Sequence, residues 1–194
     1  MKSLGAMISV LVMVLLAFAM FPAISGQISD IETFSVLVDS DSDFSEGTLT
    51  NLTTSGENLV LESSETDGTY VEKYSRSDSI NLDNATVSVN LTNSTDSTVE
   101  LKVETSSDRF KNVKDSKIQE LNDGSNSIDI SGLSGEYVRV TLTFSRTDTG
   151  VTTPEVENYN LEGVLTGSSI TLLGVITILV VVGVIVSMVK SYAF

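Results

Sequence analysis

The chain has 194 residues, with 26 acidic and 11 basic side chains, no histidine and no cysteine, and a net charge of −15. This negative field argues against nucleic acid as a partner, because phosphate binding needs the opposite sign. The usual general base, the thiolate nucleophile and the common zinc ligands are all missing from the composition. We therefore expect a non-enzyme with no resident cofactor, stabilised by an apolar core because no disulfide can form.

The N-terminal segment is apolar and carries no charge between Lys2 and Asp30. Pro22 would end a helix there, and the small residues Ala23 and Ser25 resemble a cleavage site. Residues 1–25 are therefore predicted to be a secretory signal peptide cut after Ser25. The alternative is an uncleaved membrane helix, since the stretch is long enough to span a bilayer.

The middle of the chain, residues 30–166, is predicted to be one extracellular domain. It contains all 26 acidic residues and nine of the eleven basic ones, which gives it a net charge of −17. The acids are spread along the domain instead of forming one block, which favours a high-salt habitat over a single cation-binding surface. The ratio of acids to bases indicates a haloarchaeal cell or one of its viruses, although the polar runs of Asp, Ser, Thr and Asn would also suit an ordinary secreted protein.

Strand patterning dominates this domain. In 137–145 the even-numbered residues are apolar and should face a core, whereas most odd-numbered residues are polar. Short strands with no convincing helix between them predict an all-β fold, an antiparallel β-sandwich. A short helical turn within 112–121 would not change this class. The predicted strands are 33–39, 58–63, 69–75, 85–92, 98–105, 126–131, 137–145 and 156–165.

Four stretches resemble jelly-roll β-sandwich modules of the discoidin-like and carbohydrate-binding type, which occur on archaeal and viral surface proteins. They are 43–61, which opens with acidic-aromatic-x-x-Gly, then 68–75 with Gly-Thr-Tyr, then 97–108 and 124–163. The resemblance covers most of 30–166 and rests on turn glycines, a proline and alternating apolar residues. It implies a jelly-roll sandwich, and carbohydrate binding is the function that would extend from it.

An acidic cluster precedes Gly47, formed by Asp39, Asp41, Asp43 and Glu46. Alternating acids near a strand end can supply three or four of the oxygens that Ca²⁺ requires, so these residues are a candidate calcium site. Phe44 stands where an EF-hand loop needs glycine, so that motif is absent. The alternative is an acidic surface loop in which Phe44 plugs the core.

Other candidate sites are modification and ligand sites. N-glycosylation sequons occur at Asn51, Asn84, Asn90 and Asn93, and we expect some of them to be occupied. Tyr70 and Tyr74 are four residues apart in a predicted strand and so share one face. They could form a platform for sugar stacking, although a core or edge strand would show the same pattern.

A basic cluster comprises Arg109, Lys111, Lys114 and Lys117. It could bind an acidic partner, such as the negative surface of a neighbouring copy. A solvated hairpin or helical face would give the same sequence and is the interpretation favoured here.

The C-terminal segment 168–190 is predicted to be a transmembrane helix in contact with lipid. No charge occurs between Glu162 and Lys190, and about twenty apolar residues span the hydrocarbon core. Lys190 argues against a GPI signal, and positive-inside places the tail 191–194 in the cytosol or virion interior. Gly183 and Ser187 form a small-xxx-small pair that would permit self-association.

Together these features predict a membrane-anchored protein with an extracellular β-sandwich, acting in adhesion, recognition or envelope structure at a cell or virion surface. The alternatives are a pilus or filament subunit with a retained N-terminal helix, and a sugar-binding module. The N-terminal residue of the mature protein would separate the first two.

Overall fold

The computed structural model describes residues 33–91 and 96–166, together with Gly183. Its elements are β1 (Thr33–Val38), α2 (Asp41–Phe44), β2 (Thr48–Thr50), β3 (Leu52–Ser55), β4 (Asn58–Leu61), β5 (Asp67–Asn90), β6 (Ser97–Ser106), β7 (Asp115–Leu121), β8 (Gly124–Asp129), β9 (Ser134–Arg146) and β10 (Glu155–Thr166). The chain divides into two compact units, and the one described here is Phe34–Leu165.

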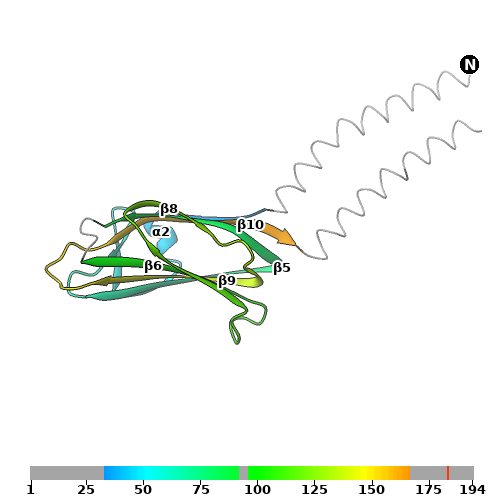
Figure 1. Cartoon of the computed structure of the whole chain (residues 1–194), viewed down its shortest axis with the longest axis horizontal. Helices are drawn as coiled ribbons and strands as arrows, with labels where there is room; N and C mark the ends of the chain where they lie inside the picture. Colours follow the sequence, from blue (N-terminus) through cyan, green and yellow to red (C-terminus); the bar gives the residue numbers. More distant parts are fainter. Residues whose placement is uncertain (1–32, 92–95, 167–182, 184–194) are drawn as a thin grey trace, which may run out of the picture. The chain divides into compact units, whose positions relative to one another are not determined.

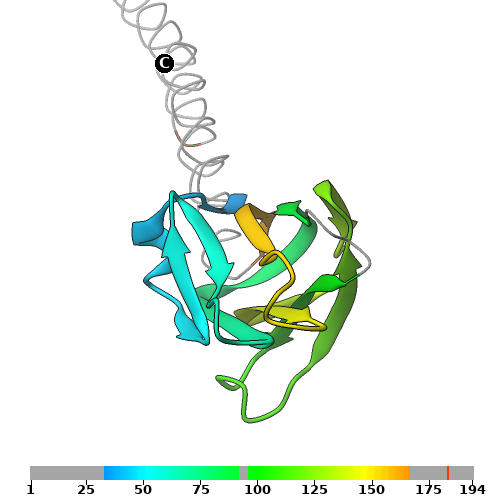
Figure 2. The same cartoon turned by 90° about the vertical axis from the view of Figure 1, so that its left-hand side faces the viewer.

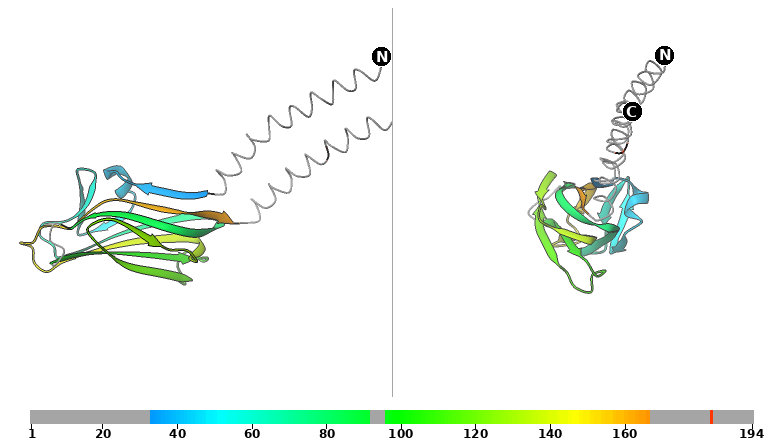
Figure 3. Two further views of the ribbon diagram at one scale, coloured as in Figure 1. Left: turned by 45° about the horizontal axis from the view of Figure 1, so that its top comes forward. Right: turned by 90° about the vertical axis from the view of Figure 1, so that its right-hand side faces the viewer.

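The domain is an antiparallel β-sandwich, as the strand pattern predicts (Figure 1). One layer contains β2, the first half of β5, β9, β6 and β7. The other contains β3, β4, β10, the second half of β5 and β8, with β1 paired to β10. Figure 2 looks at the sandwich end-on and shows the strands enclosing the core, and Figure 3 shows β1 beside β10.

Strand β5 belongs to both layers. Its first half pairs with β9 from Asp67 to Ser75, and its second half pairs with β8 from Asn84 to Val89. The pairing with β9 shifts register between Ser75 and Ile80 and ends at Asn81, after which the strand runs beside β8 in the other layer. Such bends are the usual way in which one strand turns the corner of a sandwich.

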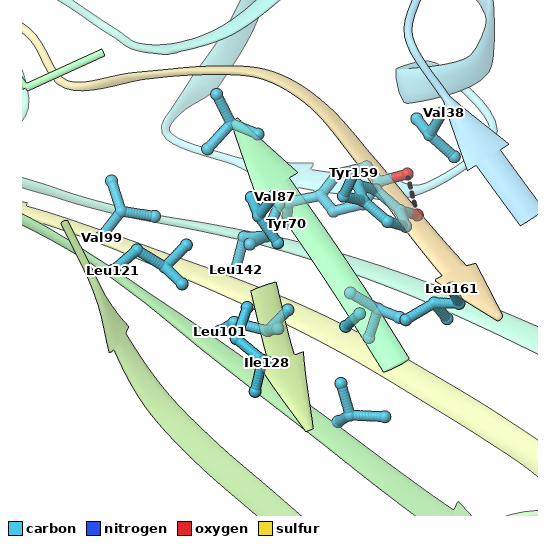
Figure 4. Packing of buried hydrophobic residues seen from close by; sticks show 14 of the residues in the cluster. Val38, Tyr70, Val87, Val99, Leu101, Leu121, Ile128, Leu142, Tyr159 and Leu161 are labelled. Carbon is cyan, nitrogen blue, oxygen red and sulfur yellow. Dashed lines mark hydrogen bonds between the residues drawn. The ribbon is translucent and has the colours of Figure 1, made fainter. Parts of the chain in front are cut away.

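The core lies between the two layers and is built from alternating residues, as period-two patterning requires. On β9 the side chains of Val138, Val140, Leu142 and Phe144 are fully buried, which confirms the predicted face. Figure 4 shows Leu101 and Leu142 from one layer packed near Val87 and Ile128 from the other. Phe44 is also fully buried, so the prediction that it plugs the core is confirmed.

The structure corrects two details of the predicted strands. Segment 112–121, where a helical turn was allowed, instead contains the edge strand β7, which pairs with β6 from Asp115 to Leu121. Most of β7 is exposed on both faces, so no apolar period marks it as a strand. The separate strands expected at 69–75 and 85–92 are parts of one strand, β5, because the polar residues between them form a bend and not a turn.

The predicted terminal segments lie outside the described residues, apart from Gly183. These are the signal segment 1–25, the span 168–190 and the tail 191–194. Within the part of the chain that is described, no helix is long and apolar enough to cross a membrane.

Candidate functional site

The acidic cluster forms a capped helical turn. Ser40 caps α2, and its hydroxyl lies 2.7 Å from Oδ2 of Asp43, a hydrogen bond that lowers the pKa of that carboxyl. Oδ1 of Asp41 accepts the backbone N–H of Glu57 at 3.1 Å. Among residues 33–91 and 96–166, no three acidic side chains converge as a metal site requires. Calcium binding by Asp39, Asp41, Asp43 and Glu46 therefore stays a prediction.

Tyr70 and Tyr74 do share one face, but that face points into the sandwich. The Tyr70 ring is fully buried, and Tyr74 is half-buried. Both belong to a buried tyrosine cluster in which the hydroxyls of Tyr70 and Tyr159 donate to the carboxylate of Glu72. The hydroxyls of Tyr74 and Tyr159 are hydrogen-bonded to each other at 2.6 Å. The ring of Tyr70 is thus placed as a core residue, out of reach of a sugar.

Close packing around the tyrosine cluster determines which residue types fit beside it. The ring of Tyr70 packs edge-on against Phe44, with centroids 5.9 Å apart, and lies 6.0 Å from that of Tyr159. A Cβ on Gly47 would collide with the Tyr70 ring, so only glycine fits there. Burial raises the pKa values of Tyr70 and Tyr159, as do their bonds to Glu72, which keeps both phenols protonated donors.

The sequons differ in their surroundings. Asn51 is exposed with φ of 56°, and its amide donates to the Asp67 carbonyl at 3.0 Å. Asn84 is half-buried between β5 and β8, where it accepts from Ser127 Oγ at 3.2 Å. Asn90 is exposed at the end of β5, and Asn93 lies outside the described residues.

The predicted basic cluster is brought together in part. Arg109, Lys111 and Lys114 lie in or at the end of the loop that joins β6 to β7, the green loop at the lower edge of Figure 2. Lys117 pairs with Val103, a core residue, and so points to the other face of its sheet near Asp129. Three residues that the sequence reasoning did not group complete the site.

These three are Lys73, Lys102 and Arg139, on the outer face of the sheet beside the loop. Register places Lys73 of β5 opposite Arg139 of β9, which in turn lies opposite Glu104 of β6. Residues from strands that are far apart in sequence thus form one continuous surface. We call this surface the basic patch; it comprises Lys73, Lys102, Arg109, Lys111, Lys114 and Arg139.

The loop of the basic patch has a defined shape. Arg109 and Phe110 both have positive φ, 60° and 64°, a conformation that costs energy in residues with a side chain. The hydroxyl of Ser106 accepts the N–H of Phe110 at 3.0 Å. Asp108 accepts the backbone N–H and the amide of Asn112 at 3.0 and 2.6 Å, and these bonds lower its pKa to about 2. This network holds Arg109 and Phe110 toward the sheet.

The centre of the patch is a guanidinium between a carboxylate and a ring. Arg139 contacts Oε2 of Glu104 through Nε and Nη2, both at 2.7 Å, and its Cζ lies 4.6 Å from the centre of the Phe110 ring. Lys102 contacts the other Glu104 oxygen at 2.8 Å. Burial alone would raise the pKa of Glu104, but the two cations outweigh it and lower that pKa.

Two partly exposed aromatic rings border this centre. Phe110 and Tyr137 pack edge-on with centroids 6.5 Å apart, and Nε of Arg109 donates to the Tyr137 hydroxyl at 3.2 Å. Rings beside guanidinium groups can hold a planar or ring-shaped ligand by apolar contact and by paired hydrogen bonds. The arrangement can therefore bind a ligand, and it presents no nucleophile paired with a base.

The comparisons with known proteins identify no family. No family model matches the chain, and neither does any curated protein. Solved structures with some likeness include a family two carbohydrate esterase from Cellvibrio japonicus, with TM-score 0.41, 8% identity and coverage of 69% of this chain but only 35% of the esterase.

Two further likenesses cover nearly whole chains of carbohydrate-related proteins. The C-terminal domain of a chitobiase from Bacteroides fragilis gives TM-score 0.41, 10% identity and coverage of 71% of this chain and 98% of that domain. A low-affinity xylan-binding module from Roseburia intestinalis gives TM-score 0.38, 11% identity and coverage of 68% and 95%.

Proposed function

We propose that the chain is a non-catalytic surface protein whose jelly-roll sandwich binds carbohydrate through the basic patch. The observation that carries the proposal is the placement of Phe110 and Tyr137 beside Arg109 and Arg139. An aromatic ring offers an apolar surface to the C–H face of a sugar, while the guanidinium of Arg109, of which only Nε is bonded to Tyr137, offers paired donors to its oxygens.

Rigidity supports this assignment. Tyr137 and Arg139 lie on β9, which pairs with both β5 and β6, so their backbones are held on both sides. The loop that carries Arg109 and Phe110 is tied by the Ser106 and Asp108 hydrogen bonds. A preorganised site loses less conformational entropy when it binds a ligand.

Display outside the cell completes the proposal. Residues 1–25 would direct export and the apolar segment 168–190 would anchor the domain, leaving 30–166 outside to serve adhesion or recognition. Carbonate washing of membranes should leave the chain in the pellet, and added protease should cut the domain on intact cells. Release by carbonate, or protection from protease, would remove this part of the proposal.

Carbohydrate binding is tested by applying the purified full-length chain to an array of neutral and anionic polysaccharides. We expect Phe110→Ala and Tyr137→Ala each to weaken retention about tenfold, the effect of losing roughly 1.4 kcal/mol of contact. Leu37→Ala is the matched control, because Leu37 is a 58% exposed apolar side chain on β1, outside the patch. If no polysaccharide is retained, or if all three variants bind like the parent, the proposal fails.

A further inference from the structure

Charge is distributed unevenly over the domain. Six of its nine basic residues form the basic patch, and the acids on the same strands and loop at this end are Glu104, Asp108, Asp115 and Glu136. Six of the nine positive charges are thus gathered on one surface of a domain whose net charge is −17, with Glu100 on the same face two residues beyond Lys102. Gathering like charges on one surface costs electrostatic free energy, and a surface of this kind is suited to binding an anion.

Several of these cations are not neutralised within the protein. Glu104 is shared by Lys102 and Arg139, so that group of three keeps one positive charge. Arg109 donates to the phenol of Tyr137, which leaves its charge unpaired within the described residues. Lys114 reaches Ser134 Oγ at 2.7 Å and forms only a long, exposed ion pair with Asp115, at 4.0 Å. Lys73 and Lys111 form no ion pair with another residue of the described part of the chain.

We infer that the ligand of this patch is an anionic polysaccharide, one that carries carboxylate or sulfate groups; this inference rests on the proposed carbohydrate binding. Arginine matches such groups with two parallel hydrogen bonds, which persist at contact distance when salt screens longer-range forces. The acidic remainder of the domain would repel an anionic polymer, so productive binding is confined to the patch.

The experiment compares polymers that differ only in charge. Polygalacturonate is paired with its methyl ester, and dextran sulfate with dextran, and each is titrated into the full-length chain by calorimetry. The test variant is Arg109→Gln with Lys111→Gln, both exposed loop positions. The matched control is Arg76→Gln with Lys117→Gln, which removes the same charge from exposed positions outside the patch.

We expect at least one charged polymer to bind tenfold or more tightly than its neutral partner. The test variant should lose at least fivefold of that affinity, and the control variant less than twofold. Circular dichroism of both variants checks that the fold is retained.

Equal binding of charged and neutral partners would overturn this inference and leave carbohydrate binding intact. Binding to none of the four polymers, with concentration-dependent self-association that the test variant abolishes, would overturn it and assign the patch to a second copy of the chain. Equal losses in the test and control variants would also overturn it, because they would reveal a non-specific charge effect.

Discussion

Arg139 and Phe110 are joined across a strand and a loop: the guanidinium carbon lies 4.6 Å from the centre of the ring. The same guanidinium holds the nearly buried Glu104, whose side chain is 5% exposed. Stacking on Phe110 therefore shields an ion pair that would otherwise face water. The position of Phe110 in the β6–β7 loop therefore affects the ion pair between Arg139 and Glu104 on the sheet.

The first prediction concerns the coupling of these two residues. In a double-mutant cycle with Arg139→Met and Phe110→Ala, the free energy of unfolding in urea should show a coupling of about 0.5–1 kcal/mol, the usual strength of an exposed cation–π pair. A cycle of Phe110→Ala with Lys117→Met should show no coupling, because Lys117 points to the other face. Equal coupling in the two cycles would contradict the assignment.

The second prediction concerns the buried tyrosine cluster. Tyr159→Phe removes a hydroxyl that donates to the buried Glu72 and leaves that carboxylate short of a donor. The free energy of unfolding should fall by about 1–3 kcal/mol, the cost of a buried polar group without its partner. Tyr137→Phe, which removes a partly exposed hydroxyl, is the control and should cost less. Equal losses of unfolding free energy in the two variants would show that the buried Tyr159 hydroxyl stabilises the domain no more than a partly exposed hydroxyl does.

The third prediction concerns Arg146, a buried arginine that forms no ion pair with another residue of the described part of the chain. Its guanidinium donates to the carbonyls of Glu62, Ser63, Glu65 and Val151, at 2.7 to 3.2 Å. Arg146→Met should lower the free energy of unfolding by about 2–4 kcal/mol, because the charge-assisted hydrogen bonds from this buried side chain to four backbone carbonyls are lost.

The control for this substitution is Arg76→Met, an exposed position at which a change of about 0.5 kcal/mol or less is expected. Chemical denaturation of both variants at constant salt makes the comparison. Similar stabilities for the two variants would mean that Arg146 does not clamp the loops that it contacts.

The fourth prediction concerns pH. Hydrogen bonds from Asn112 and Ser106 lower the pKa of Asp108 to about 2, below its ordinary value of 3.8. A lowered folded-state pKa adds stability above pH 3.8, and this stability is lost as pH falls toward 2. The loop should therefore loosen between these values while the sandwich persists.

NMR titration of the Asp108 carboxyl carbon measures this directly. Asn112→Ala keeps the backbone donor but removes the amide, and should move the midpoint upward toward the ordinary value. An Asp108 midpoint near 4 in the parent protein would contradict the network described here.

The fifth prediction concerns glycosylation. Asn84 is half-buried and its side chain is bonded across β5 and β8, whereas Asn90 is exposed at the end of β5. Intact mass of the protein from its native host should therefore fall by one glycan in Asn90→Gln and stay unchanged in Asn84→Gln. The reverse result would show that modification precedes folding and ignores the native surface.

Much of the sandwich could be predicted from the sequence because its strands are long and buried on one face. The alternation in β9 is visible as apolar even-numbered residues, and all four of the predicted core side chains are buried. Phe44 could also be placed, because an aromatic residue inside an acidic loop has few other stable positions. These features depend on local period alone.

The site could be predicted only in part, because it depends on register. Arg109, Lys111 and Lys114 are close in sequence and were found, but Lys73 and Arg139 meet them through strand pairing that no local pattern reveals. Lys117 was misgrouped because a one-residue change along a strand reverses the face. No local pattern marks Arg146 either, since its partners are backbone carbonyls of distant loops.

The bend in β5 has one further consequence. A single uninterrupted backbone serves both sheets, so separating them would require that this strand be torn from β9 or from β8. In a chain without cysteine, this continuous strand is a covalent link between the two layers of the sandwich.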